Sequence, residues 1–86
     1  MFTLRWSEDA AGFFDGLTEK EKVQVDRVLL SLATDPFNAP NSKHLTGPLA
    51  GLHSVRIRSW RIIYSIPAEP GLVDLLVFND RKDVYR

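Results

Sequence analysis

The spacing of apolar residues changes near the middle of this chain, and the change limits the folds that the chain can adopt. Between Thr18 and Pro36 the apolar residues recur at helical intervals, which is typical of an amphipathic helix. Such a stripe is formed by Val25, Val28, Leu29 and Leu32. After Leu52 the pattern changes to alternating or short continuous apolar segments, which are typical of strands. This order predicts an α+β domain.

Two helices are predicted in the first part. Ser7 can accept hydrogen bonds from the first amides of a helix over residues 8–15, and Gly16 ends that helix. The run Thr18-Glu19-Lys20-Glu21 fits a capping box, in which two side chains satisfy backbone donors at a helix start. The second helix ends at Asp35-Pro36, because proline disfavours helical backbone at the residue before it.

Four strands are predicted around these helices. Residues 2–6 alternate between apolar and polar, and further strand-like segments cover 52–58, 60–66 and 72–78. Residues 36–51 are rich in Pro, Gly and Asn, so we expect an irregular loop without a regular element. The order β-α-α-β-β-β predicts an antiparallel sheet with two N-terminal helices packed on one face, in a single domain of all 86 residues.

Charge is distributed unevenly, although the formal net charge is zero. Residues 1–42 contain four basic and seven acidic side chains, whereas residues 43–86 contain seven basic and four acidic ones. Such asymmetry can give a neutral protein an electropositive face. Nucleic acid therefore stays among the candidate ligands.

Several kinds of site are disfavoured by composition. Cysteine is absent, which excludes disulfides and thiolate metal sites. His44 and His53 are too far apart for a helical ligand pair, so we expect no metal site and no cofactor. By strand alternation we interpret His53 as a core or edge residue, and we interpret His44 as a turn residue. No apolar run approaches the ~20 residues of a membrane span and no signal peptide is evident, so we expect a cytoplasmic protein without a membrane partner.

Three arginines are predicted to share one face of the sheet. Alternation places Arg56 and Arg58 on the same face, and a hairpin through Ser59 can bring Arg61 beside them. Clustered guanidinium groups bind phosphate oxygens bidentately and can stabilise charge that develops on a reacting phosphate. The alternative is a solvated sheet face, on which arginine stems cover apolar surface.

Four short motifs together resemble those of the RelE/ParE toxin family. They are Lys43-His44-Leu45-Thr46-Gly47, Leu49-Ala50-Gly51, the strand pair from Val55 to Tyr64, and the closing segment Asp80-Arg81-Lys82-Asp83-Val84-Tyr85. The resemblance implies a RelE-like fold and the toxin of a type II toxin–antitoxin system. Its RelE branch cuts mRNA in the ribosomal A site without metal, by attack of a ribose 2′-hydroxyl on the adjacent phosphate. The implied partners are a cognate antitoxin, which would form a hetero-oligomer with the toxin, and the ribosome with its mRNA.

The resemblance also implies roles for individual residues. Arg61 and Arg81 would stabilise the scissile phosphate, and Arg56 matches a position held by a catalytic lysine or arginine. Tyr85 would position the mRNA base or the attacking nucleotide. Further RNA or phosphate contacts are expected from the remaining basic residues of these motifs: Arg58, Lys82 and Lys43.

Two positions depart from the family pattern. Asp80 stands where many members have a histidine that can act as general acid, and Ser54 occupies the first of the alternating basic positions. These departures keep two alternatives open, a ParE-like inhibitor of DNA gyrase and a catalytically degenerate module that binds its antitoxin. Retention of Arg61, Arg81 and Tyr85 favours the ribonuclease.

Overall fold

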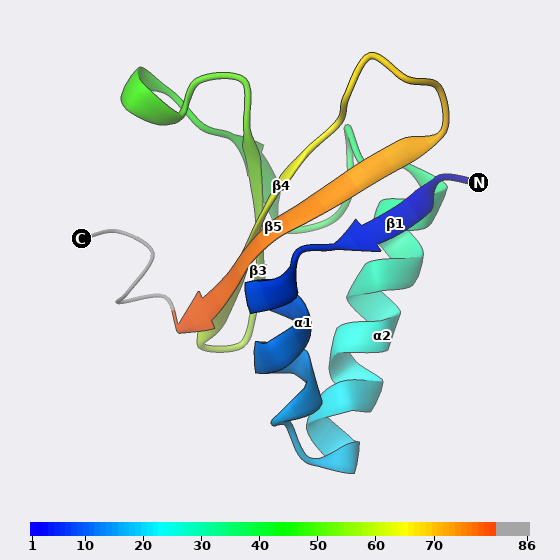
Figure 1. Cartoon of the computed structure of the whole chain (residues 1–86), viewed down its shortest axis with the longest axis vertical. Coiled ribbons are helices and arrows are strands. Elements are labelled where there is room, and N and C mark those ends of the chain that lie inside the picture. The colour runs from blue at the N-terminus through cyan, green and yellow to red at the C-terminus, as the bar shows by residue number, and fades with distance from the viewer. Residues whose placement is uncertain (81–86) are drawn as a thin grey trace.

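The computed structural model describes residues 1–80 of the 86-residue chain. Its elements, in chain order, are β1 (Thr3–Trp6), α1 (Glu8–Asp15), α2 (Glu19–Thr34), β2 (Ser42–His44), the 3-10 turn η1 (Gly47–Leu49), β3 (His53–Ile57), β4 (Trp60–Ser65) and β5 (Leu72–Asp80). Figure 1 shows the two helices side by side on one face of a twisted sheet. The α+β class and the two helices on one face are therefore confirmed.

The five strands form one sheet in the order β1-β5-β4-β3-β2. Neighbours are antiparallel, except that β1 lies parallel to β5, with Thr3 opposite Leu72. The sheet is thus mixed, which corrects the wholly antiparallel arrangement expected from the sequence. The α1–α2 hairpin separates β1 from the later strands, so no short turn dictates the direction in which β1 docks.

The segment between α2 and β3 is more regular than its composition suggested. It contains β2 and η1, which corrects the expectation of a loop without regular elements. Asn41 adopts a left-handed conformation with φ 63° and turns the chain into β2. The three residues of β2 then pair with the otherwise open edge of β3. A strand this short has too few residues to show a period of two.

Both helix starts follow their sequence signals. The Ser7 hydroxyl accepts a hydrogen bond from the Ala10 amide at 3.1 Å. At α2 the Thr18 amide donates to the Glu21 carboxylate at 2.8 Å, and the Glu21 amide donates to the Thr18 hydroxyl at 3.2 Å. The predicted capping box is therefore present, and it fixes where α2 begins beneath the sheet.

The core lies between the helices and one face of the sheet. Its fully buried side chains include Val25 and Leu32 of α2 and Tyr64 and Phe78 of β4 and β5. Aromatic rings extend this core beneath β1, where Trp6 lies 5.3 Å from Phe14 between ring centroids. Within residues 1–80 neither helix covers the opposite face, which carries the side chains considered next. No helix in this part of the chain is long and apolar enough to cross a membrane.

Candidate anion-binding site

The β3–β4 hairpin sets two arginines directly opposite each other. Its register pairs Ile57 with Trp60 across a two-residue turn, and so pairs Arg56 with Arg61. Like charges in directly opposed sheet positions destabilise the pairing. Arg61 is also only 5% exposed, with its Nε and Nη1 atoms buried, and burying a guanidinium carries a desolvation cost. An anion bound beside these two arginines would reduce the repulsion between them, so the cluster is suited to binding an anion.

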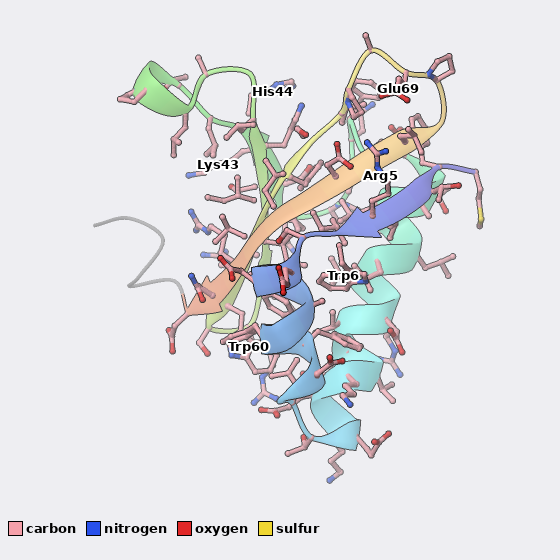
Figure 2. All side chains as sticks on the ribbon, in the orientation of Figure 1. Arg5, Trp6, Lys43, His44, Trp60 and Glu69 are labelled. Carbon is pink, nitrogen blue, oxygen red and sulfur yellow. The ribbon has the colours of Figure 1, made fainter. Side chains whose placement is uncertain are left out.

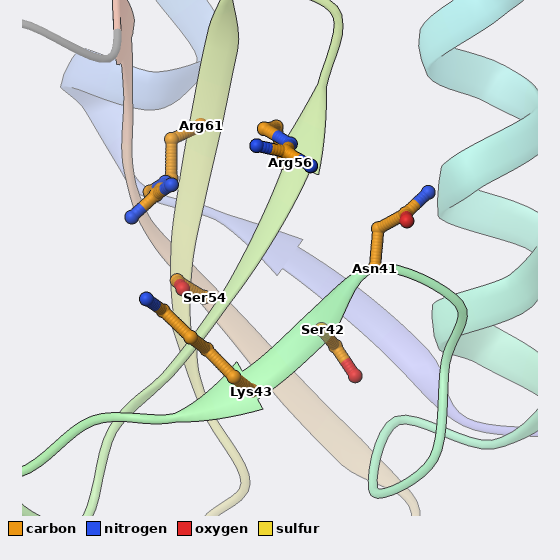
Figure 3. Close-up of a pocket in the computed structure, with 6 residues that line it drawn as sticks. All are labelled: Asn41, Ser42, Lys43, Ser54, Arg56 and Arg61. Carbon is orange, nitrogen blue, oxygen red and sulfur yellow. The ribbon is translucent and has the colours of Figure 1, made fainter.

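Lys43 of β2 brings a third positive charge to the same place. It lies opposite Ser54, which is itself 2% exposed. Figure 3 shows the Lys43 and Arg61 side chains extending toward one another across Ser54, with Arg56 beside them. Positively charged side chains from β2, β3 and β4 therefore surround the same pocket.

The pocket has a volume of about 250 Å³. It is lined by Asn41, Ser42, Lys43, Ser54, Arg56 and Arg61. Its lining within the described part of the chain contains no carboxylate. The Ser54 hydroxyl can donate one hydrogen bond into the pocket, and the guanidinium forks can each bind two oxygens of a phosphate. The arrangement suits a phosphate group better than a neutral ligand.

Backbone contacts hold the β2 side of the pocket in place. The Arg56 amide donates to the Asn41 carbonyl at 3.3 Å, and the Ser42 hydroxyl donates to the Ala39 carbonyl. Figure 3 shows the Asn41 and Ser42 side chains turned away from Lys43. These two residues therefore contribute to the wall mainly through the path of the backbone.

Arg58 does not join this cluster, which corrects the expectation that it shares a face with Arg56. It lies in the hairpin turn with φ 56°, so strand alternation does not extend to it. Its Nη1 atom donates to the Gln24 side chain of α2 at 3.1 Å, and its guanidinium lies 6.0 Å from the Trp60 ring centroid. Arg58 thus faces the helices.

The remaining predicted site residues have different outcomes. Arg81, Lys82 and Tyr85 lie outside the described residues, so their roles stay predictions. Asp80 is the last residue of β5 and lies opposite Trp60. The sequence reasoning did not include Asn41, Ser42 or Ser54 in the site. Only the pairing of β2 with β3 reveals Asn41 and Ser42 as lining residues, while Ser54 was noted solely as a departure from a basic pattern.

Arg5, the other arginine whose side chain is described on the sheet, is engaged elsewhere. Its Nε and Nη2 atoms donate to the two carboxylate oxygens of Asp74 at 2.6 and 3.0 Å. The Arg5 hydrogen bond and charge hold the pKa of Asp74 below its usual range. This bidentate pair joins β1 to β5, whereas the pocket lies along β2, β3 and β4.

The two histidines lie together on the helix-facing side of β2 and β3. His53 is buried and stacks on Tyr64 with ring planes 15° apart, which confirms it as a core residue. His44 is the last residue of β2 rather than a turn residue, and its ring centroid lies 4.3 Å from that of His53. Burial and the neighbouring His44 lower the pKa of His53.

Comparison with known proteins gives matches in structure but not in sequence. No family model matches the chain, and no curated protein matches it. The toxin–antitoxin complex RelBE2 from Mycobacterium tuberculosis matches with a TM-score of 0.77 and 26% identity, over 93% of this chain and 98% of that one. The YoeB/ParE toxin from Agrobacterium tumefaciens gives a TM-score of 0.81 at 16% identity, over 94% and 99% of the two chains.

A third solved structure, the isolated E. coli RelE toxin, matches with a TM-score of 0.76 and 21% identity. The match covers 99% of this chain and 92% of that toxin. The described residues thus have the fold of RelE, YoeB and ParE toxins, and the resemblance inferred from four short motifs is confirmed.

Proposed function

We propose that this chain, which has the fold of RelE-type toxins, is the toxin of a type II toxin–antitoxin system and cuts mRNA on the ribosome. The observation that carries the proposal is the meeting of Lys43, Arg56 and Arg61 around one pocket without a lining carboxylate among the described residues. Such a pocket can hold the phosphate of an RNA backbone.

The proposed reaction depends mainly on the stabilisation of negative charge and uses no cofactor. The ribose 2′-hydroxyl gives its proton to water and attacks the adjacent phosphorus, and the bond to the 5′-oxygen of the next nucleotide breaks as that oxygen takes a proton from water. The non-bridging oxygens gain negative charge in the transition state. Arg56 and Arg61 stabilise that charge through their guanidinium forks, and Lys43 adds a third positive charge from the neighbouring strand β2.

The residues of the closing segment complete the proposal. Arg81 adds a further phosphate contact, Lys82 binds the RNA backbone, and Tyr85 positions a base or the attacking nucleotide. Arg58, which faces α2, takes no part in the chemistry.

The proposal includes an antitoxin that restrains the activity in the cytoplasm. The M. tuberculosis, E. coli and Pyrococcus horikoshii RelE-type chains were solved as complexes with their antitoxins. An acidic segment of an antitoxin would complement the Lys43, Arg56 and Arg61 cluster and exclude RNA from it. The two proteins would then form a hetero-oligomer.

Inducible expression in a bacterial host tests the proposal, with primer extension on abundant transcripts. Arg56→Ala and Arg61→Ala are compared with the wild type and with Arg58→Ala, a matched control outside the pocket. We expect growth arrest and new cuts within translated codons for the wild type and Arg58→Ala, and loss of both for the pocket variants. Circular dichroism of each purified chain establishes that the variants fold. Unchanged cutting in folded Arg56→Ala and Arg61→Ala would refute the proposal.

One observation favours a second candidate, a ParE-like inhibitor of DNA gyrase. Ser54 gives the pocket a short neutral side chain at a position where the RelE branch has a basic one. The same expression experiment separates the two functions, because gyrase inhibition produces DNA breaks while transcripts stay intact. A chain that folds and binds its antitoxin but leaves growth unaffected is instead a degenerate module.

A further inference from the structure

His44 and His53 are cross-strand neighbours at the position where side chains lie closest. The Leu45 amide donates to the Leu52 carbonyl at 2.9 Å, and the Arg56 amide donates to the Asn41 carbonyl at 3.3 Å. Hydrogen-bonded and non-hydrogen-bonded pairs alternate along an antiparallel ladder. His44 opposite His53 is therefore a non-hydrogen-bonded pair, the type with the shorter Cα separation.

We propose that His44 and His53 together form a bidentate binding site for a divalent transition-metal ion of the Cu²⁺, Ni²⁺ and Zn²⁺ class. Their ring centroids lie 4.3 Å apart, with the planes inclined by 52°. Metal–nitrogen bonds of about 2 Å place two imidazoles bound to one ion at roughly this separation. The site is separate from the anion pocket and does not depend on the proposed function.

Neighbouring residues hold His53 in place before a metal arrives. Its ring stacks on Tyr64 at 5.2 Å between centroids and meets the edge of Phe37 at 6.4 Å. Tyr64 is fixed in turn by donating a hydrogen bond to the Pro36 carbonyl at 2.7 Å. A ligand already ordered by packing loses little freedom on binding. His44, exposed at the end of the edge strand, is the ligand through which the ion enters.

The ligand set determines which ions fit. Within residues 1–80 no third His, Cys, Asp or Glu joins the pair to complete a closed site. The ion would therefore keep water in its other positions. Imidazole nitrogen without a carboxylate suits copper, nickel and zinc rather than magnesium or calcium, and Cu²⁺ should bind most tightly of the three.

Binding would clamp β2 to β3. β2 is a three-residue edge strand that contains both Lys43 and His44, whose side chains are labelled in Figure 2. An ion that joins the rings of His44 and His53 favours the paired state of the strand that carries Lys43 into the anion pocket. Because the ion binds the folded chain, the melting temperature should rise with metal concentration.

The test titrates the purified, untagged full chain with Cu²⁺ alone, followed by calorimetry and electron paramagnetic resonance. We expect one ion per chain and nitrogen hyperfine structure from two imidazoles. His44→Gln changes an exposed side chain and should keep the fold, whereas affinity should fall at least tenfold and the two-nitrogen signal should be lost. His53→Asn should act in the same direction.

A thermal melt provides an independent readout. The wild-type melting temperature should rise with Cu²⁺, and that of His44→Gln should not. Wild-type affinity retained in folded His44→Gln, a signal from a single nitrogen in the wild type, or the absence of saturable Cu²⁺ binding would each overturn the proposal.

Discussion

Tyr64→Phe removes one buried hydroxyl and leaves its ring in place. Tyr64 is fully buried in β4, and its hydroxyl donates to the Pro36 carbonyl at 2.7 Å. This bond joins the sheet to the start of the segment that leads through Asn41 into β2. The phenylalanine ring can keep the stacking on His53, so the change removes only the contacts of the hydroxyl, the bond to Pro36 and the interaction with Ser42.

The expected cost follows from the burial of both partners. Pro36 is also fully buried, so its carbonyl would lose its tyrosine partner away from solvent. Leaving a buried acceptor unsatisfied costs about 1–3 kcal/mol. In a domain of this size each kcal/mol shifts the melting temperature by roughly 4–8 °C. A central value of about 2 kcal/mol therefore predicts a melting temperature lower by roughly 8–16 °C.

Thermal melts followed by circular dichroism, with urea titrations for the free energy of unfolding, measure this loss. Thr34→Ala is the matched control, because the Thr34 hydroxyl donates to the Leu30 carbonyl at 2.8 Å at an exposed site. Water can replace that bond, so we expect a change below about 0.5 kcal/mol. If Tyr64→Phe melted within about 2 °C of the wild type, or no lower than Thr34→Ala, the argument from burial would fail.

Three further variants test local features. The hydrogen bond from Arg5 lowers the pKa of Asp74, so this ion pair stabilises the folded state at pH values above the ordinary pKa of a carboxyl group. The stabilisation is lost as the pH falls through the lowered pKa of Asp74. Asp74→Asn should therefore reduce the urea midpoint at pH 7, with the reduction shrinking as the pH is lowered through the acid range, and a reduction that stays constant with pH would contradict this. Thr18→Ala removes the capping hydroxyl of α2 and should cost about 1 kcal/mol in the same titrations, whereas no change would mean that the cap is not stabilising. Asn41→Val places a β-branched residue at φ 63° and should cost about 1–2 kcal/mol, with Asn41→Gly as the tolerated comparison; equal midpoints for the two would argue against the left-handed turn.

The helices and the longer strands could be predicted because their signals are local. Ser7 and Thr18 mark the helix starts by side-chain chemistry that acts within three residues. The Arg56–Arg61 pair could also be predicted, since a hairpin through Ser59 fixes the register of its two strands. These parts of the fold and site need no information about distant contacts.

The remaining features depend on contacts between distant segments. β2 exists because the edge of β3 accepts it, and with it Lys43 reaches the pocket and His44 meets His53. Arg58 was misplaced because a turn residue with positive φ does not continue the alternation of its strand. The parallel direction of β1 likewise follows from docking after two intervening helices rather than from any turn.

The pairing of β1 with β5 affects how the protein can be made. Arg5 of the first strand and Asp74 of the last are separated by 69 positions, and they meet only in the finished sheet. Pairing between such distant positions slows folding, because closing a long loop carries an entropic cost before the contact forms. During synthesis β1 remains without its neighbour until β5 has left the ribosome. A growing chain therefore cannot complete this sheet before its fifth strand has emerged, and β1 waits beside an open position until then.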